Sequence, residues 1–454
     1  STNIQHLTSN IFAKMIWNEE IETIERSALE DLQSQRLSKL AAYVYERVPF
    51  YKDQFDKAGV SPADIKDISD ITKLPFTTKE QMRNNYPFEM FAVPMNEVVR
   101  THASSGTTGK PTVVGYTRND LAVWAEVVAR CFCLSGAKPG DVFQNAYGYG
   151  LFTGGLGMHY GAELMGLNTI PVSGGNTARQ MLLLQDFKTD IMACTPSYAL
   201  TLADALMNAG IDPADLPVRS FILGAEPWTD EMSSEIEEKL HADAVNIYGL
   251  SEIIGPGVSN ECVETKDGLH LMEDHFLCEI INPDTGEPVA EGEIGELVIT
   301  TITKEAIPLI RYRTKDLCSI NKAPAATGRT HARMSRVLGR ADDMLIIRGV
   351  NVFPSQIEAT MISMTEISPH YKLVVTREDR LDRLEIQPEV TEDFFREVDG
   401  LNGLHNSPQA QALKDRVAKE MRESLLVGAK VTLIPPGSAP RSEGGKIKRV
   451  EDKR

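Results

Sequence analysis

Cysteine is scarce in this sequence. Six cysteines occur among 454 residues, at positions 131, 133, 194, 262, 278 and 318, and most of them lie in apolar stretches. So few cysteines exclude a dense disulfide framework. We therefore expect reduced, mostly buried thiols in a cytoplasmic protein.

Long hydrophobic runs are missing as well. No apolar run approaches the ~18 residues that a membrane-spanning helix needs. Residues 1–20 lack the basic region followed by an apolar region that marks a secretory leader. We expect a soluble, unsecreted protein that has no membrane partner.

Basic residues are in the minority, with 47 Lys and Arg against 64 Asp and Glu and a formal net charge of −17. A strongly negative surface disfavours binding to nucleic acid and to anionic membranes. The last twenty residues reverse this trend, because they contain six Lys or Arg and three acidic residues. This basic end of an acidic chain needs an explanation.

The length suggests about three domains, at ~150 residues each, or one large domain with a smaller companion. From about residue 113 to 249, apolar or β-branched runs alternate with helix-like stretches, which predicts βα units and a largely parallel sheet. The expected strands are 142–146, 168–172, 190–195, 220–224 and 244–248, and the expected helices are 119–134, 178–187, 198–209 and 230–240.

The regions on either side have different patterns. Residues 19–59 are typical of helices, with Ser27 and Glu30 as a capping box and an interruption at Pro49. Between 261 and 319 the pattern changes to strands and turns, which predicts a β-rich subdomain at about 260–335. The pattern of strands and helices after Asp342 predicts a compact α+β unit. We expect an α/β fold with a large domain, 1–341, and a small mobile domain, 342–454.

The stretch Ser104–Thr112 is rich in hydroxyl groups and contains Gly106, Gly109 and Lys110. Glycines let backbone N–H groups turn toward an anion, and the lysine adds a positive charge, so the stretch suits phosphate. It is not a Walker loop, because Pro111 and an extended segment follow the lysine instead of a helix. An ordinary Ser/Gly/Thr surface loop is the alternative.

Two polar clusters follow predicted strands, where ligands bind in open α/β sheets. They are Gly224-Ala225-Glu226-Pro227 and Tyr248-Gly249-Leu250-Ser251-Glu252. Tyr248 could stack on a base, Ser251 could reach a phosphate, and Glu252 could hold a hard cation. Each cluster alone could be an ordinary strand-to-helix turn.

Further clusters occur in order along the chain. They are 85–88 (NYPF), 146–155 (AYGYGLFTGG), 311–316 (RYRTKD), 339–343 (GRADD), 348–354 (RGVNVFP) and 444–446 (GGK). Together with the three segments above, they resemble the adenylate-forming superfamily of acyl-CoA synthetases and adenylation domains, and within it most closely the phenylacetate-CoA ligase family. The resemblance covers essentially the whole chain.

The resemblance implies roles for individual residues in binding ATP and Mg²⁺. The loop Ser104, Ser105, Gly106, Thr107, Thr108, Gly109 and Lys110 would hold the β- and γ-phosphates, and Gly224, Ala225, Glu226 and Tyr248 would line the adenine site. Pro227 and Gly249 would also belong to the nucleotide-binding residues. Ser251 would meet the α-phosphate and Glu252 would ligate Mg²⁺. Asp316 would accept hydrogen bonds from the ribose hydroxyls, assisted by Arg340.

The resemblance also implies which residues carry out catalysis, form the hinge and bind the acid. Lys446 matches the catalytic lysine, which bridges the acid's carboxylate and the α-phosphate, and Asp342 matches the hinge about which the small domain rotates between two half-reactions. The acid would lie in a pocket formed by Tyr147, Phe152, Gly224, Ala225, Pro227, Tyr248 and Ile254. Such a wall suits an aryl or arylalkyl acid, although Tyr147 and Phe152 could be core aromatics instead.

The sequence departs from the expected family pattern in places. Met158 stands where a small residue is expected, Ile253-Ile254 replaces a Val-Met pair, and Gly444 lengthens the segment before Lys446. A zinc site at Cys262, His270, His275 and Cys278 is an alternative that lacks the close ligand pairs of strong zinc motifs. Relatives of this kind are commonly homodimers, but the periodicity here indicates no interface.

Three functions stay open from the sequence. The first is an aryl acid:CoA ligase, in which coenzyme A attacks the acyl-adenylate. The second is a stand-alone aryl-acid adenylating enzyme, of amino- or hydroxybenzoate type, that loads the phosphopantetheine of an acyl carrier protein. The third is a catalytically dead scaffold or sensor, against which the joint presence of Glu252, Asp316 and Lys446 argues.

Overall fold

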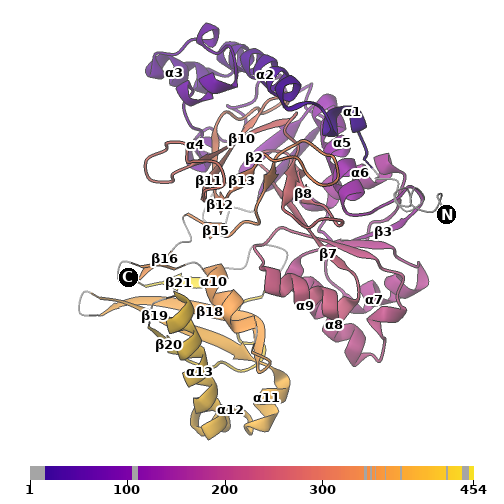
Figure 1. The fold of residues 1–454 in the computed structure, drawn as a ribbon, viewed down its shortest axis with the longest axis vertical. Coiled ribbons are helices and arrows are strands. Elements are labelled where there is room, and N and C mark those ends of the chain that lie inside the picture. The colour runs from indigo at the N-terminus through magenta and orange to yellow at the C-terminus, as the bar shows by residue number, and fades with distance from the viewer. Residues whose placement is uncertain are drawn as a thin grey trace, which may run out of the picture.

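The computed structural model shows a large N-terminal unit and a smaller C-terminal unit that packs against one end of it (Figure 1). It describes residues 16–104, 111–341, 345–347, 350–352, 354–362, 364–378, 381–425, 428–441 and 449–453. Within these ranges no helix is both long enough and apolar enough to cross a membrane.

The chain begins with helices α1 (Glu19–Glu22), α2 (Arg26–Arg47) and α3 (Pro49–Ala58). Pro49 opens α3, as the predicted interruption requires. The predicted capping box is wrong: α2 begins before Ser27, and Arg26 Nε donates to Glu30 Oε1 at 3.0 Å. Arg26 also pairs with Glu273, so a long-range contact fixes the helix start. Short helices η1 (Pro62–Asp64), η2 (Ile68–Lys73) and α4 (Lys79–Asn84) follow.

A nine-stranded sheet forms the centre of the N-terminal unit, in the order β13-β14-β9-β8-β7-β6-β5-β3-β4. Its parallel half is β3 (Val142–Asn145), β4 (Asn168–Ile170), β5 (Ile191–Cys194), β6 (Ser220–Leu223) and β7 (Asp243–Leu250). Helices α5 (Arg118–Leu134), α7 (Thr177–Asp186), α8 (Pro196–Asn208) and α9 (Asp230–Leu240) alternate with these strands, and η3 (Pro213–Asp215) precedes β6. The predicted βα alternation is confirmed.

Helix α6 (Thr153–Met165) was not predicted, because its glycines disfavour a helix in isolation. The structure shows why they are there. A Cβ added at Gly157 would lie 2.4 Å from Trp124 Cζ2, and one added at Gly161 would lie 2.3 Å from Val128 Cγ1. The glycines therefore let α6 approach α5 closely, and tertiary packing outweighs intrinsic propensity.

The sheet changes character at β7, which pairs with β6 in parallel and with β8 (Gly255–Glu261) antiparallel. Its antiparallel half continues through β9 (Leu269–Leu271), β14 (Arg333–Met334) and β13 (Ile320–Asn321). A second antiparallel sheet contains β10 (Phe276–Ile281), β11 (Gly295–Thr301), β12 (Tyr312–Cys318) and β15 (Gly339–Arg340). A hairpin is formed by β1 (Arg100–Ser104) and β2 (Thr112–Tyr116).

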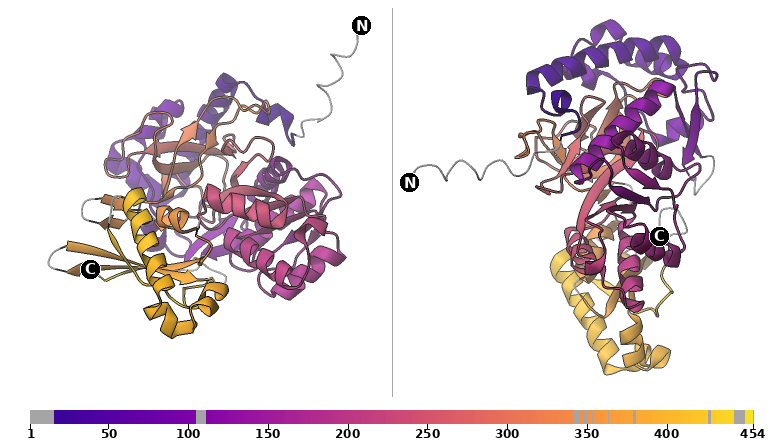
Figure 2. Two further views of the ribbon diagram at one scale, coloured as in Figure 1. Left: turned by 60° about the horizontal axis from the view of Figure 1, so that its bottom comes forward. Right: turned by 90° about the vertical axis from the view of Figure 1, so that its right-hand side faces the viewer.

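The C-terminal unit has a separate hydrophobic core, drawn from residues between Leu345 and Leu433. Its sheet has the order β20-β19-β18-β21, with β18 (Ile367–Glu378), β19 (Leu381–Val390), β20 (Ala429–Val431) and β21 (Val450–Asp452). A hairpin of β16 (Leu345–Ile347) and β17 (Val350–Val352) precedes α10 (Pro354–Ile362). Helices α10 and α13 (Pro408–Leu425) pack against the sheet, and α11 (Glu392–Glu397) and α12 (Gly400–Asn406) follow one another beside α13 (Figure 2). The predicted fold class is confirmed.

Candidate active site

Three of the predicted site residues meet at one carboxylate. Tyr248, near the end of β7, donates its hydroxyl to Asp316 Oδ2 at 2.6 Å. Arg340 on β15 donates from Nη1 to Asp316 Oδ1 at 3.0 Å, and Asp316 and Arg340 are register partners across β12 and β15. Burial, and then the Asp316 carboxylate, raises the pKa of Tyr248 well above its usual value, so the phenol keeps the proton that it donates.

The turn between β7 and β8 carries Ser251, Glu252 and Ile254, all of them buried. Ser251 Oγ lies 2.9 Å from Thr153 Oγ1, at the first turn of α6. Glu252 Oε1 lies 2.8 Å from Lys79 Nζ on α4. A carboxylate and a hydroxyl that were predicted to bind ligands therefore lie side by side at the carboxyl end of the parallel strands, where such sites form.

Lys304 holds the backbone of this turn and was missed by the sequence analysis. Its Nζ donates to the carbonyl oxygen of Ile253 at 2.7 Å and to that of Glu252 at 3.1 Å. Burial lowers the pKa of Lys304 to about 8, against the opposing effects of Asp120 and Glu252. Nothing in the local pattern distinguishes this lysine, because the carbonyls that it binds lie far away in the chain.

The cluster Gly224–Pro227 follows β6, and its first residue lies very close to the backbone of β7. A Cβ added at Gly224 would lie 2.4 Å from the carbonyl oxygen of Ile247, so only glycine fits there. Ala225 has a left-handed φ of 72°, a strained conformation of the kind that gathers at functional sites. Glu226 Oε1 accepts the backbone N–H of Ser197 at 2.7 Å, and this contact caps the start of α8. Gly249, in the β7–β8 pair, is equally confined, since its Cβ would lie 1.9 Å from the carbonyl oxygen of Gly255.

The aromatic residues predicted for the acid pocket differ in their surroundings. Tyr147 belongs to the main core, and its hydroxyl donates to the carbonyl oxygen of Cys194 at 2.6 Å. Phe152 is 43% exposed at the residue before α6, and Ile254 is buried. Tyr147 thus has the packing of a core aromatic, whereas Phe152 has a free face. Their roles in binding an acid stay predictions.

Several predicted residues lie outside the described part of the chain. Of the phosphate loop, the structure describes only the backbone of Ser104, at the end of β1, and Ser105–Lys110 lie outside the described ranges, as do Asp342 and Lys446. The domain boundary predicted at 341/342 also stays a prediction. In the described ranges, no group of three or more His, Cys, Asp or Glu could hold a metal. His275, one of the four weighed for zinc, instead contacts Thr303 Oγ1 at 2.8 Å and Asp274 Oδ2 at 3.1 Å.

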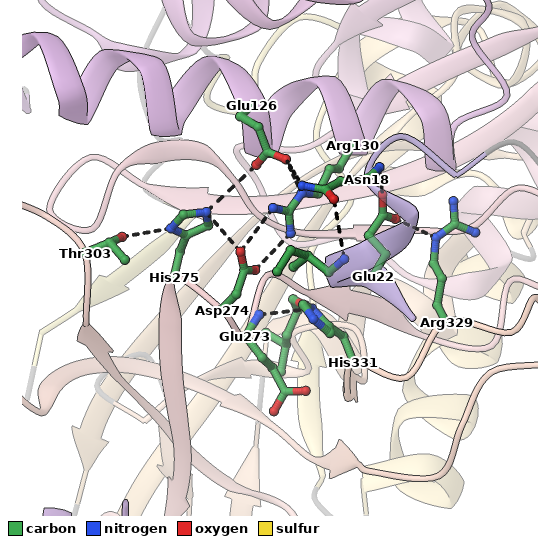
Figure 3. Close-up of polar contacts among 12 residues, drawn as sticks. Asn18, Glu22, Glu126, Arg130, Glu273, Asp274, His275, Thr303, Arg329 and His331 are labelled. Carbon is green, nitrogen blue, oxygen red and sulfur yellow. Dashed lines mark hydrogen bonds and ion pairs between the residues drawn. The ribbon is translucent and has the colours of Figure 1, made fainter. Parts of the chain in front are cut away.

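A second group of buried charges lies among α1, α5 and the residues just before β10 (Figure 3). Arg130 makes two hydrogen bonds to Asp274, of 2.9 and 3.1 Å. Arg329 Nε donates to Glu22 Oε2 at 2.8 Å. We call Glu22, Arg130, Asp274 and Arg329 the frame cluster, and Tyr248, Glu252, Asp316 and Arg340 the site cluster.

Comparison with known proteins shows which family this chain belongs to. The model of the AMP-binding enzyme family matches residues 4–303, and that of the AMP-binding enzyme C-terminal domain matches residues 349–454. The chain belongs to the AMP-binding enzyme family. The phenylacetate-coenzyme A ligase of Thermus thermophilus is 54% identical over 97% of this chain and 100% of its own length, and that of Escherichia coli is 49% identical over 97% and 99%.

Solved structures of 2-hydroxyisobutyryl-CoA ligase in two states are similar to this chain to different degrees. In its postadenylation state that protein matches this chain with a TM-score of 0.89, at 26% identity over 100% of this chain and 95% of that one. In its thioesterification state, with CoA, the TM-score is 0.71, at 28% identity over 96% and 92%. The fold of this chain as a whole is therefore more similar to the postadenylation structure than to the thioesterification structure.

Proposed function

We propose that this protein activates an aryl or arylalkyl carboxylic acid, of the phenylacetate type, with ATP and transfers the acyl group to coenzyme A. The products would be the aryl-CoA thioester, AMP and pyrophosphate. The observation that carries the proposal is the contact of Tyr248, Asp316 and Arg340 at the carboxyl end of β7, in a chain about half identical to phenylacetate-coenzyme A ligases. We place the protein in the cytoplasm, where the six free cysteines would stay reduced.

The site cluster suits the nucleoside of ATP. An ionised carboxylate has two oxygens that each accept hydrogen bonds, so Asp316, which already accepts from Tyr248 and Arg340, suits the two hydroxyls of a ribose. Gly224 and Gly249 let neighbouring backbone segments pack closely beside Tyr248, because a Cβ at either would meet a carbonyl oxygen, that of Ile247 or of Gly255. The loop Ser104–Lys110 and Ser251 would hold the phosphates.

Glu252 fits a hard divalent cation such as Mg²⁺. It is a buried carboxylate, and the structure already places a cationic nitrogen, Lys79 Nζ, 2.8 Å from its Oε1. Carboxylate oxygens are the ligands that Mg²⁺ prefers beside phosphate oxygens. A bound Mg²⁺ would supply positive charge against the phosphates, and Lys304 would keep the carbonyls on either side of this position fixed.

Attack of a carboxylate on a phosphate brings like charges together. We assign Lys446 to the acid's carboxylate and the α-phosphate, where a compact ammonium offsets the repulsion that builds in the transition state. The acyl-adenylate would then be attacked by the thiol of coenzyme A after rotation about Asp342. This route needs no protein nucleophile. The buried cysteines agree with it, since burial raises the pKa of Cys131 and of Cys194 above the usual range.

A pyrophosphate-exchange assay with ATP, Mg²⁺ and a panel of benzoate, phenylacetate and hydroxylated or aminated benzoates tests the proposal. We expect exchange with an aryl acid and formation of its CoA thioester when CoA is added. Adenylation without any thioester would instead favour the carrier-protein enzyme, and absence of exchange with every acid would favour a scaffold or sensor. The carrier-protein acceptor and a homodimer stay predictions from the sequence.

The assignment of Lys446 has its own test. We expect Lys446→Ala to lower the adenylation rate by about 10³-fold, the size of effect seen when one electrostatic stabiliser is removed. Formation of the thioester from supplied acyl-adenylate should change little, because the residue would leave the site on domain rotation. Equal losses in the two half-reactions, measured separately, would contradict the assignment.

A further inference from the structure

Two buried carboxylates in the C-terminal unit are each paired with an arginine. Glu358, on α10, receives a hydrogen bond of 2.9 Å from Arg449 Nη1. Glu389, on β19, receives one of 2.5 Å from Arg441 Nη2. Both carboxylates are almost completely buried. A buried charge must be compensated, and the pair of Glu358 and Arg449, whose side chains are 5% and 14% exposed, is costly to separate.

The Glu358 pair is reinforced from several sides. Tyr371 donates its hydroxyl to Glu358 Oε2 at 3.1 Å, and the guanidinium of Arg449 lies 5.0 Å from the centre of the Tyr371 ring. The carbonyl oxygen of Arg449 accepts the N–H of Leu373 at 2.8 Å, which begins the pairing of β21 with β18. The backbone and the side chain of Arg449 are therefore both fixed to the sheet.

The Glu389 pair holds the chain that leads up to Arg441. Glu389 Oε2 accepts the backbone N–H of Ala439 at 2.8 Å, while Oε1 accepts the guanidinium. Arg441 Nη1 also donates to the carbonyl oxygen of Ala439 at 3.2 Å. The carboxylate thus ties the backbone and the end of this segment to β19, although the Arg441 side chain is itself 40% exposed.

The two arginines stand immediately on either side of residues 442–448, the segment that contains Lys446. Lys446 itself lies outside the described residues. In the sequence, two residues separate it from Arg449 and four separate it from Arg441. The two pairs therefore hold the described residues that lead directly into this segment from both sides.

The pairs are close enough to share an electrostatic environment. His370, next to Tyr371 on β18, has its pKa lowered to about 4, first by burial and then by Arg441, with a further contribution from Arg449. The side of the C-terminal unit that carries Glu358 faces the N-terminal unit, because α10 packs against α9 (Figure 1). Glu226, beside the start of α8, adds to the electrostatic potential at both Glu358 and Arg449.

We infer that Glu358 and Glu389 are positioning residues for the adenylation half-reaction, acting through Arg449 and Arg441 on the segment that carries Lys446. The inference rests on the proposed function of Lys446. Because the reaction needs an ammonium at a defined place, small displacements of the segment matter: a misplacement of about 1 Å can cost 10²-fold in rate. Coenzyme A attack, which does not use Lys446, should not depend on these carboxylates.

Glu358→Gln tests the inference because it removes the charge and keeps the shape of the side chain. We expect adenylation to fall by about 10²-fold in kcat, with the KM for ATP near that of the wild type and thioester formation from supplied acyl-adenylate unchanged. Glu389→Gln should act in the same direction but less strongly, since Arg441 is farther from Lys446 along the chain. Tyr371→Phe, which removes one bond to Glu358 and keeps the packing, gives a milder version if Glu358→Gln does not fold.

The matched control is Glu451→Gln. Glu451 lies on β21, just after Arg449, and pairs with Lys372 at the surface. Both half-reactions should match the wild type in this variant. Equal losses in both half-reactions, or no loss in either, for Glu358→Gln, or for Tyr371→Phe where the former does not fold, would overturn the inference. Lys446→Ala in the same assay separates the two proposals: if it retains adenylation, the assignment of Lys446 has failed instead.

Discussion

The frame cluster and the site cluster are both groups of paired charges, yet they differ in how the partners of their buried carboxylates are held. In the frame cluster the side chains of Arg130 and Asp274 are 2% and 3% exposed, and two hydrogen bonds join them. In the site cluster the side chain of Glu252 is 5% exposed, but its partner Lys79 is 42% exposed. A solvated partner can be exchanged for a ligand at low cost, and an enclosed one cannot. Burial of charge alone therefore does not identify a site.

We expect the largest effect from a substitution in the frame cluster, and we expect it on stability. Asp274→Asn leaves Arg130 buried with a weaker partner, so we expect the free energy of unfolding to fall by about 3–5 kcal/mol. Adenylation per folded molecule should be unchanged below the melting transition. Urea denaturation measures the first quantity and pyrophosphate exchange the second.

Asp204→Asn is the control for this variant, because Asp204 pairs with Lys239 at the surface. It should change stability by less than about 1 kcal/mol. If Asp274→Asn lowered the rate of adenylation while stability stayed the same, the distinction between the two clusters would be wrong.

In the site cluster we expect a substitution to weaken ATP binding and to leave stability nearly unchanged. Asp316→Asn removes the charge that Arg340 and Tyr248 share, and hydrogen bonds to charged groups contribute about 1.5–3 kcal/mol. We expect the KM for ATP to rise by about 10- to 100-fold and the melting temperature to stay near that of the wild type. A large loss of stability with an unchanged KM would place Asp316 in the frame instead.

The smallest effect concerns pH and the buried His270 near the frame. Burial, with help from Arg329, lowers the pKa of His270 to about 3. Well above pH 6.5 the ring is neutral in both the folded and unfolded states. As the pH falls from 6.5 toward 3, the unfolded chain binds a proton that the folded one does not, so stability falls. Between pH 7.5 and 6 this loss is about 1 kcal/mol.

His270→Gln removes this titration, so the fall in stability between pH 7.5 and 6 should become smaller by that amount. Urea denaturation at the two pH values measures it. The same fall in the variant as in the wild type would show that His270 does not titrate in this way.

The sequence predicted what depends on local pattern. Strand ends are local, so the clusters at Gly224 and Tyr248 fell where parallel strands end, and the order of the motifs brought Asp316 and Arg340 to Tyr248. Contacts between segments that are distant in the chain leave no recognisable pattern in the local sequence. Lys79 and Lys304 reach Glu252 from other parts of the chain, and neither stands out among neighbouring residues.

The errors of the sequence analysis have the same origin. The capping box at Ser27 failed because Arg26 is held by Glu273, a residue of the distant frame. Helix α6 was missed because its glycines are explained only by the helix that they touch. Local propensity is a weak guide wherever a tertiary contact decides the conformation.

Tryptophan is rare in this chain, with three residues, and two of them lie beside the candidate site. Trp124 donates its indole N–H to the carbonyl oxygen of Pro256 at 2.9 Å, just after the turn that carries Glu252. Trp228 follows Pro227, and its ring lies 4.4 Å from the guanidinium carbon of Arg336. The protein therefore carries its own optical reporters: ligand binding at the turn should change its intrinsic fluorescence, with no label attached.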